Sequence, residues 1–270
     1  MSTAVITLSK EGAEVAQKRA AVIGPCDLFC HAKAEVHTII DSLNVQPALW
    51  KPFDSVVELT AVIFSKYRRI VYVMPTGIVV RSIAPLVRTK LEDPAVVVLD
   101  VAGRWAISLL SGHEGGANQL AMEVASAIDA EPIITTTTEA VKTLIAGVGC
   151  RRGTEAQAIV LAVESAVSHV GKSVEDIRIL ASVDIKSDEM GLIEASRQMD
   201  LPLRFIGSEE IRRSLRTFTH SDFVQEKVGL PAVAEPAALL AGRRTRLLLP
   251  KQIYNGVTVA IARESCTWSE

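Results

Sequence analysis

Residues 69–100 read RIVYVMPTGIVVRSIAPLVRTKLEDPAVVVLD, and this stretch decides the fold class. Two β-branched runs, RIVYVM at 69–74 and PAVVVLD at 94–100, enclose the amphipathic segment TGIVVRSIAPLV. Strand-like runs joined by a helix-length segment predict parallel strands with a crossover helix. Gly77 lies where the chain would turn from strand to helix. The stretch therefore predicts an open α/β sheet.

The same alternation extends in both directions along the chain. In the first half we predict strands at 4–8 and 131–136 and helices at 9–20 and 115–128, with a further strand ending in 108–112. The second half begins a new sheet at LIAGVGCRRGT, and its predicted elements are helices near 154–169, 188–199 and 231–241 and strands at 177–183, 201–206, 245–250 and 256–262. We therefore predict two α/β domains, 1–142 and 143–270, with mostly parallel sheets flanked by helices and a cleft between the domains.

Composition narrows the class of ligand. The chain has 270 residues, a formal net charge of -2 and 49% hydrophobic residues. No apolar run approaches the roughly 20 residues that cross a bilayer, and no export signal is recognisable at the amino terminus. Acidic and basic residues are scattered, which gives no electrostatic footprint for nucleic acid or membrane. We expect a soluble, cytoplasmic protein that binds a small molecule.

The four cysteines, Cys26, Cys30, Cys150 and Cys266, are too few and too dispersed for a disulfide framework. Cys26 and Cys30 lie close enough in sequence to His31 and His37 to suggest a zinc site. No second cysteine pair follows, so the sequence favours ordinary thiols and we predict no protein metal site.

The run SGHEGGAN at 111–118 is the first candidate for catalysis. It should join a strand to a helix and place His113 and Glu114 in the turn. A histidine exchanges protons near neutral pH, and an adjacent glutamate can orient it or act as a base. Asn118 could donate a hydrogen bond to a developing oxyanion. The structural alternative is a helix cap beside a solvated glutamate.

The run GVGCRRGT at 147–154 is the second candidate. Its glycines superficially resemble a phosphate loop, but the lysine followed by Ser or Thr is missing, so a nucleotide-binding function has weak support. Arg151 and Arg152 lie beside a predicted helix start and could bind carboxylates bidentately. The alternative is a pair of solvated arginines.

Further polar residues follow predicted strand ends. Asp184, Lys186, Asp188 and Glu189 come after the strand at 177–183, and alternation would put Asp184 and Lys186 on one side, able to pair or to face a ligand. Glu235 precedes Pro236, a residue suited to a first helical position, so Glu235 is either a helix N-cap or a ligand contact.

Taken together, these motifs resemble a known family. VMPTGIVVRSIAPLVRTKLEDPAVVVLD, LLSGHEGGANQLA and EPIITTTTE resemble the amino-terminal region of the CbiG family of cobalamin biosynthesis. GVGCRRGT, ASVDIKSDEMGLIEAS, VGLPAVAEPAALLAG and LLLPKQIYNGVTVAIA resemble the carboxy-terminal domain of that family, which also occurs as a separate CobE-like protein. The matches cover most of residues 65 to 263, and their joint order is specific.

The resemblance implies hydrolysis of the δ-lactone of cobalt-precorrin-5A, with release of acetaldehyde, to give cobalt-precorrin-5B. It implies that cobalt arrives within the substrate and that no separate cofactor is needed. We expect His113 or Glu114 to activate water, and Asn118 with the N–H groups of Gly115 and Gly116 to stabilise an oxyanion. The predicted substrate-binding residues are Gly77, Arg81, Ser111, Gly112, Gly115, Gly116, Gly149, Arg151, Arg152, Asp184, Lys186 and Glu235.

One departure from the family pattern concerns the middle segment that members often carry. Here only Glu139 to Thr143 separate Thr138 from LIAGVGC, so that segment is essentially absent. The alternative function is a non-catalytic carrier that binds corrinoid intermediates through the same loops. As partners we expect the cobalt-precorrin substrate and either a second copy of the chain or neighbouring pathway enzymes.

Overall fold

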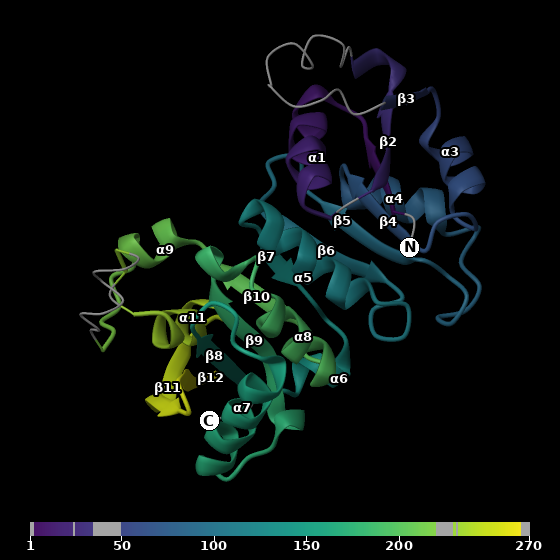
Figure 1. Ribbon diagram of the computed structural model, residues 1–270. Coiled ribbons are helices and arrows are strands. Elements are labelled where there is room, and N and C mark those ends of the chain that lie inside the picture. Colours follow the sequence, from purple (N-terminus) through teal and green to yellow (C-terminus); the bar gives the residue numbers. More distant parts are fainter. Residues whose placement is uncertain (1–2, 24, 35–49, 220–228, 231, 266–270) are drawn as a thin grey trace. The chain divides into compact units, whose positions relative to one another are not determined.

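The computed structural model describes residues 3–23, 25–34, 50–219, 229–230 and 232–265 (Figure 1). The chain divides into two compact units, Met1–Thr136 and Thr137–Glu270, each described here by itself. Each unit contains one sheet flanked by helices, which confirms the predicted fold class of two α/β domains with mostly parallel sheets. The predicted domain boundary, between residues 142 and 143, and the predicted cleft stay predictions.

The first unit is built on a seven-stranded sheet with the order β3-β2-β1-β4-β5-β6-β7. Among the described strands all neighbours are parallel except β5 and β6. The strands are β1 (Thr3–Thr7), β2 (Cys26–His31), β3 (Trp50–Phe53), β4 (Arg69–Val73), β5 (Ala95–Leu99), β6 (Trp105–Leu110) and β7 (Glu131–Ile133).

The reversal of β6 follows from its short connection to β5. Only residues 100–104 join the two strands, whereas a parallel crossover needs about a dozen residues or more. The Asp100 carboxylate fixes this turn by accepting the N–H groups of Arg104 at 2.6 Å and Trp105 at 2.9 Å. These hydrogen bonds lower the pKa of Asp100 although burial opposes the shift. As a consequence, β6 and β7 end at the edge of the sheet where β4 and β5 begin.

Helices cover both faces of this sheet. Because side chains alternate along a strand, Val71, Val73 and Val97 pack with α1 and α5 on one face, whereas Ile70 and Tyr72 pack with α3 and α4 on the other. The helices are α1 (Lys10–Ile23), the 3₁₀ helix Ala32–Ala34, α3 (Val56–Ile63), α4 (Thr76–Ile83) and α5 (Ala117–Ile128).

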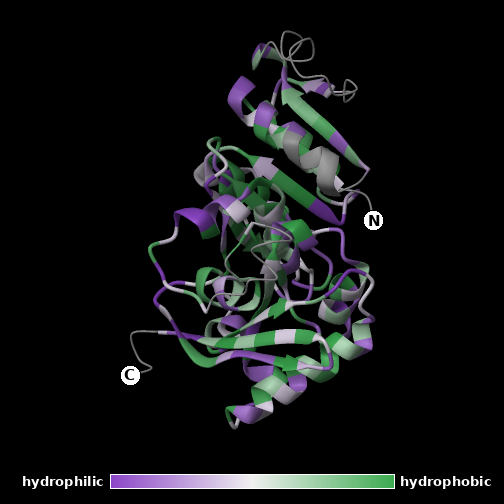
Figure 2. Cartoon of the chain, turned by 60° about the vertical axis from the view of Figure 1, so that its left-hand side comes forward, coloured by the Kyte–Doolittle hydropathy of each residue, from purple (hydrophilic) through white to green (hydrophobic). Residues whose placement is uncertain are grey.

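The second unit has a five-stranded sheet with the order β10-β9-β8-β12-β11. The first three strands in this order run parallel, and β12 and β11 form an antiparallel hairpin beside β8. In Figure 2 the strands of both units are predominantly coloured as hydrophobic. The strands are β8 (Leu144–Gly149), β9 (Ile177–Val183), β10 (Leu203–Ile206), β11 (Thr245–Tyr254) and β12 (Val257–Glu264).

Two helical layers cover the second sheet. Helices α7 and α8 pack on one face, against side chains such as Val148 and Ile261. Helix α11 packs on the other face, where Ala260 and Ala262 meet it. The helices are α6 (Thr137–Ala140), α7 (Ala156–His169), α8 (Met190–Gln198), α9 (Ser208–Arg213) and α11 (Ala234–Leu240), with 3₁₀ helices at Val174–Asp176 and Asp184–Lys186.

The predicted helices and strands are all present, with ends shifted by a few residues. Apart from the short 3₁₀ helices, five of the described elements were not predicted, namely β2, β3, α3, α6 and α9. Their sequences carry weak signals: CDLFCH and WKPF are short and mix polar residues with apolar ones, and α9 is a single polar stretch, SEEIRR. The predicted β7 is shorter than expected, because the chain leaves the sheet after Ile133.

Candidate functional site

The loop between β6 and α5 has a tightly defined backbone. Ser111 follows the strand with a φ of +58°, in the left-handed region that a residue with a side chain rarely adopts. The Ser111 carbonyl accepts the N–H of Ala117 at 3.1 Å, and the Gly112 carbonyl accepts the N–H of Asn118 at 2.9 Å. A Cβ at Gly115 would lie 2.3 Å from the Cβ of Ser111, so only glycine fits there. The loop is therefore a fixed strand-to-helix turn, not a loose hinge.

The buried side chain of Asn118 stabilises this turn through hydrogen bonds. It is 6% exposed, its Oδ1 accepts from the Ser108 hydroxyl at 2.8 Å and its Nδ2 donates to the Thr136 hydroxyl at 3.0 Å. The Asn118 amide thus ties the end of β6 to the segment after β7. Its predicted contact with an oxyanion stays a prediction, and these bonds make it first of all a positioning residue for the loop.

His113 and Glu114 form the exposed tip of the turn. The Glu114 carboxylate pairs with the ammonium group of Lys90, which lies just before β5. This hydrogen bond lowers the pKa of Glu114 below its ordinary value. A carboxylate with a lowered pKa is a weaker base, which counts against Glu114 as the base, and the choice between His113 and Glu114 stays a prediction.

The N–H groups of Gly115 and Gly116 are both predicted to stabilise an oxyanion, but they differ in their hydrogen bonds. The Gly116 N–H donates to the His113 carbonyl at 3.3 Å, and Gly116 itself has a φ of +84°. Among the described residues, no acceptor is seen for the Gly115 N–H. The buried hydroxyl of Ser111, which is 7% exposed, also has no partner in the described part of the chain. Gly115 and Ser111 are thus among the groups of this turn with unused hydrogen-bonding capacity.

The structure does not bring Gly77 and Arg81 to this loop. Gly77 lies in the first turn and Arg81 in the last turn of α4, which follows the carboxyl end of β4, and the reversal of β6 puts the loop at the opposite edge of the sheet. The five residues of β5 set a separation of roughly 15 Å between the edges, at about 3.3 Å a residue. The Arg81 guanidinium donates to the Gly77 carbonyl at 3.1 Å within its own helix. The substrate contacts predicted for both residues stay predictions.

A pocket that the sequence did not reveal lies on the loop's own edge. It measures about 410 Å³ and is lined by residues that precede β4 and β5, including Arg68, Arg88 and Leu91. Lys90, which pairs with Glu114, belongs to the same segment as Arg88. The short β5–β6 connection was the signal that could have placed these residues at the same edge of the sheet as His113.

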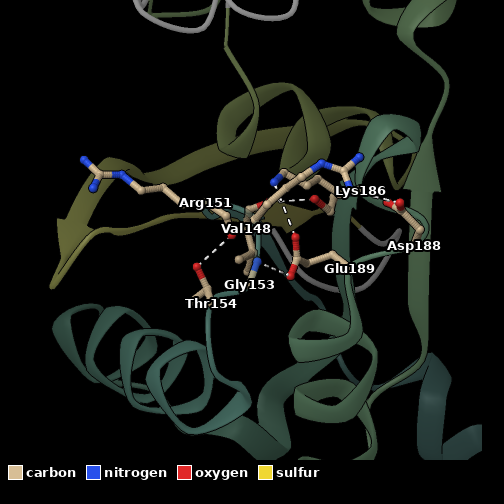
Figure 3. A network of polar contacts seen from close by, with 9 residues as sticks. Val148, Arg151, Gly153, Thr154, Lys186, Asp188 and Glu189 are labelled. Atoms are coloured by element: carbon tan, nitrogen blue, oxygen red, sulfur yellow. Dashed lines mark hydrogen bonds and ion pairs between the residues drawn. The ribbon is translucent and has the colours of Figure 1, made fainter.

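In the second unit the predicted loops do meet. Because β8, β9 and β10 are parallel, their carboxyl ends share one edge, and the turns after β8 and β9 contact each other (Figure 3). Arg152 pairs with Asp188 at 2.9 Å, and Asp188 raises the pKa of the guanidinium. The buried Glu189 accepts the N–H of Gly153 at 2.9 Å and pairs with Lys186 at 3.6 Å. Arg152 and Glu189 therefore hold the two turns together, while Lys186 pairs with Glu189 within its own turn.

The glycines of GVGCRRGT have structural reasons of their own. A Cβ at Gly147 would lie 2.0 Å from the Ala234 carbonyl oxygen, and one at Gly149 would lie 3.2 Å from the side chain of Val233. Both glycines belong to β8 and let α11 approach the sheet. Gly153, with a φ of +74°, forms the turn itself. The glycine pattern is explained by helix packing and a turn, without a phosphate.

Two acidic residues behave differently from expectation. Asp184 lies in a 3₁₀ helix, not in a strand, and accepts the N–H groups of Ile185 and Ser208, each at 2.8 Å, instead of pairing with Lys186. Glu235 is not an N-cap, because α11 begins at Ala234 and its N-cap is Val233. The Glu235 carboxylate accepts the N–H groups of Thr219 at 2.6 Å and Lys251 at 3.0 Å. Glu235 therefore pins β11 to the start of α11.

The alternative zinc site has no support from the described residues. Cys26 and Cys30 lie at opposite ends of β2, roughly 13 Å apart at about 3.3 Å a residue. His31 Nε2 contacts the Asp54 carbonyl at 3.1 Å, while His37 and Cys266 lie outside the described residues. Burial raises the pKa of Cys30 to about 11, which keeps it a thiol. The described helices also include none long and apolar enough to cross a membrane.

Comparison with known proteins places this architecture among the proteins of cobalamin synthesis. The family model described as "Cobalamin synthesis G N-terminal" matches residues 58–139, and "Cobalamin synthesis G C-terminus" matches residues 144–262. The chain belongs to the CbiG family.

Named relatives extend these matches. A cobalt-precorrin-5A hydrolase of Priestia megaterium is 25% identical over 357 positions, covering 96% of this chain and 94% of the relative. The cobalt-precorrin-5A hydrolase of Salmonella typhimurium is 26% identical, covering 96% and 97%. Protein CobE of Sinorhizobium sp. is 31% identical and covers 47% of this chain and 83% of CobE. The alignment of 357 positions exceeds the 270 residues of this chain, so the Priestia relative has segments without a counterpart here.

Proposed function

We propose that this protein hydrolyses the δ-lactone of cobalt-precorrin-5A and releases acetaldehyde, giving cobalt-precorrin-5B. Two relatives named for this hydrolase activity align with nearly the whole chain. The observation that carries the proposal within the structure is the braced turn after β6, which holds His113 exposed at its tip while the surrounding backbone is fixed by hydrogen bonds. A carrier would need cations for carboxylates but no acid–base group held in this way.

In the proposed reaction His113 acts as the general base. Its imidazole takes a proton from water, and the hydroxide adds to the lactone carbonyl, whose C–O bond then breaks to give a carboxylate and an alcohol. The imidazolium returns its proton to the alcohol oxygen as the lactone opens, and the neutral imidazole then takes the alcohol proton as the adjacent C–C bond breaks in a retro-aldol step. Acetaldehyde leaves, and the electron pair of that bond remains on the macrocycle.

Other groups of the turn stabilise the oxyanion that forms during this reaction or hold the turn in position. The Gly115 N–H is the backbone donor suited to an oxyanion, because the Gly116 N–H already binds the His113 carbonyl. Glu114, which forms an ion pair with Lys90, links the tip of the turn to the segment before β5. Asn118 keeps the turn in place through Ser108 and Thr136.

Incubation of the purified protein with cobalt-precorrin-5A, followed by an assay for acetaldehyde, tests the proposal. We expect His113→Ala to lower the rate about 100-fold to 10,000-fold, the range typical of a lost general base. The matched control is His169→Ala, an exposed histidine at the end of α7 in the other unit. An unchanged rate for His113→Ala would remove the base assignment, and absence of acetaldehyde from the wild-type protein would remove the hydrolase.

The choice between His113 and Glu114 has its own test. Glu114→Gln keeps the hydrogen-bonding shape but loses the charge that pairs with Lys90. We expect a rate loss of at most about 10-fold, since in this proposal Glu114 only holds the tip of the turn through its partly exposed ion pair with Lys90. A loss as large as that of His113→Ala would instead identify Glu114 as the base.

A second candidate function is a non-catalytic carrier of corrinoid intermediates. It is favoured by one observation: the CobE relative aligns with less than half of this chain but with most of its own length. Tight binding of cobalt-precorrin-5A without acetaldehyde release would support this alternative over the hydrolase.

The remaining expectations belong to the same proposal. Cobalt enters as part of the substrate, and no resident cofactor takes part. We place the protein in the cytoplasm, acting as a homodimer or through transient contacts with neighbouring pathway enzymes, because labile intermediates must pass between them. Sedimentation with and without substrate distinguishes the two assemblies.

A further inference from the structure

The pocket of about 410 Å³ in the first unit lies at the edge of the sheet where β4 and β5 begin, the edge that also carries the loop after β6. Its walls are the ends of α3 and α4 and the residues that lead into β4 and β5. The charged and exposed apolar residues of the lining are Arg68, Arg88, Glu92, Asp93 and Leu91, the last of which is 73% exposed. We call it the Arg68–Arg88 pocket.

The pocket and the loop after β6 are neighbours across three strands. Leu110, the last residue of β6, pairs with Val96, so the loop begins beside the first residues of β5. Pro94, which lines the pocket, directly precedes β5. On the other side of β5 the Arg68 carbonyl accepts the N–H of Ala95 at 2.9 Å. Since adjacent strands lie about 4.8 Å apart, the backbone of Arg68 lies roughly 10 Å from the start of the loop.

The ion pair between Lys90 and Glu114 joins the pocket to the tip of the loop. Lys90 belongs to the segment that lines the pocket, between Arg88 and Leu91. Glu114 directly follows His113, so the ion pair brings this segment beside the exposed tip of the turn. The pocket and His113 thus lie close together on one edge of one unit, where a single large ligand can contact both.

The charges of the lining differ in their exposure. Among the described residues no carboxylate pairs with the guanidinium of Arg68 or Arg88, and both arginines are exposed. Asp93 is only 6% exposed, and its two oxygens accept the backbone N–H of Arg88 at 3.1 and 3.0 Å. This carboxylate therefore fixes the backbone that carries Arg88. The formal charges of the lining cancel, but a ligand meets two exposed guanidinium groups and one exposed carboxylate, that of Glu92.

We propose that the Arg68–Arg88 pocket binds a carboxylate-bearing edge of the corrinoid substrate while His113 acts on the lactone. Guanidinium groups bind carboxylates bidentately, and the exposed Leu91 offers aliphatic surface to the ring. This inference rests on the proposed function for the identity of the ligand. It deepens that function by assigning substrate recognition to Arg68 and Arg88, two residues that the sequence did not single out.

Equilibrium binding to the full-length protein tests the pocket without relying on catalysis. The probes are cobyrinic acid, which carries free carboxylates, and its methyl ester, which keeps the ring and the cobalt without those charges. We expect the acid to bind more tightly, and Arg68→Gln and Arg88→Gln each to weaken its binding about 5-fold, the upper end for one exposed ion pair. The matched control is Arg104→Gln, an exposed arginine at the opposite edge of the same sheet, which leaves the affinity unchanged.

Glu92→Gln should change the affinity in the opposite direction. Loss of the exposed carboxylate of the lining should tighten binding of the acid by about 2-fold to 5-fold and leave binding of the ester unchanged. The effects of all three substitutions should shrink as salt is raised toward about 1 M, where the Debye length falls to about 3 Å. A purely structural role of the two arginines would produce neither the opposite sign nor the salt dependence.

Four results would overturn the proposal: the methyl ester binds as tightly as the acid, neither compound binds, either arginine variant binds the acid like the wild type, or Glu92→Gln weakens its binding.

Failure of this inference can be told apart from failure of the hydrolase proposal. With cobalt-precorrin-5A, Arg68→Gln and Arg88→Gln should raise the KM for acetaldehyde release and leave kcat near its wild-type value, because neither arginine touches the reacting atoms. Normal release with an unchanged KM in both variants would remove the pocket and leave the enzyme. Arginine-dependent binding of cobyrinic acid by a protein that releases no acetaldehyde would keep the pocket and remove the enzyme.

Discussion

The two units of this protein place their loops by different rules, although both are α/β folds. In the second unit β8, β9 and β10 are parallel, so the loops that follow them meet at one edge. In the first unit β6 is reversed, so the loop with His113 lies at the opposite edge from the loop with Gly77. Ligands of open α/β sheets bind beyond the carboxyl ends of the strands. In the second unit this rule points to one place, but in the first unit the residues predicted to form one site lie at two opposite edges of the sheet.

The difference changes which cations can serve His113. Arg81, which follows β4, lies on the wrong edge, whereas Arg68 and Arg88 line a pocket on the same edge as the loop. In the second unit the predicted arginines stay at the common edge but divide their roles, Arg152 binding Asp188 and Arg151 lining a pocket. One strand direction thus decides more about the candidate site than any single motif.

Substitution of glycines in each unit tests how its loops and helices are positioned, and the largest effect is expected at Gly147 in the second unit. Its added Cβ would meet backbone atoms of α11, 2.0 Å from the Ala234 oxygen and 2.6 Å from the Ala238 nitrogen. We expect Gly147→Ala to lower the free energy of unfolding of the second unit by about 3 kcal/mol, because backbone cannot move aside. Urea unfolding measures it. Gly171→Ala, which has open space and only a positive φ, should cost about 1 kcal/mol, and equal losses would contradict the packing role of Gly147.

Gly115 makes the corresponding test in the first unit. An added Cβ would lie 2.8 Å from the Ser111 carbonyl oxygen, which also accepts the Ala117 N–H. We expect Gly115→Ala to lower stability by about 2 kcal/mol and to lower acetaldehyde release at least about 100-fold, since the turn must shift. Gly116→Ala, where nothing lies within 4 Å, should cost about 1 kcal/mol from its positive φ alone. A milder effect on the rate from Gly115→Ala than from Gly116→Ala would contradict this account of the turn.

The sequence predicted the fold class well because its strands are strongly patterned. Runs such as RIVYV and AVVVL are buried on both faces and flanked by helices with regular apolar spacing. The sequence also predicted that the turns after β6 and β8 would join strands to helices. Local propensity determines such features, so one sequence is enough to read them.

The arrangement of the site could not be read in the same way. The partners of Arg152 and Asn118 lie far along the chain, at Asp188 and Thr136, and no local pattern shows such contacts. Glu235 illustrates the same limit, since its position before Pro236 indicated a cap while its carboxylate binds N–H groups from two distant segments. The reversal of β6, by contrast, could have been predicted from the sequence, because the connection of residues 100–104 is too short for a parallel crossover.

Glu235 gives the next largest expected effect, on the second unit alone. Burial opposes ionisation, but the N–H groups of Lys251 and Thr219 lower the pKa of the carboxyl below its ordinary value. A lowered folded-state pKa means that the stabilisation is present above about pH 4.3, the ordinary pKa of glutamate, and is lost as the pH falls through the folded-state pKa. We expect Glu235→Gln to cost about 2 kcal/mol in urea unfolding at pH 7 and progressively less as the pH falls below about 4.3. A cost that does not change with pH would show that the charge is irrelevant.

The smallest expected change in the free energy of unfolding comes from Ser111. This residue belongs to the loop after β6, which the reversal of β6 places at the opposite edge of the sheet from the loop with Gly77. Its buried hydroxyl has no partner among the described residues, so Ser111→Ala should raise the free energy of unfolding by about 1 kcal/mol. Ser108→Ala in the same segment should lower it by about 1 kcal/mol, because the Ser108 hydroxyl donates to Asn118. Opposite signs from two neighbouring serines would show that the fold itself does not use the Ser111 hydroxyl. If acetaldehyde release falls in Ser111→Ala while stability rises, the substrate is the missing partner, and the left-handed backbone at Ser111 is retained for function.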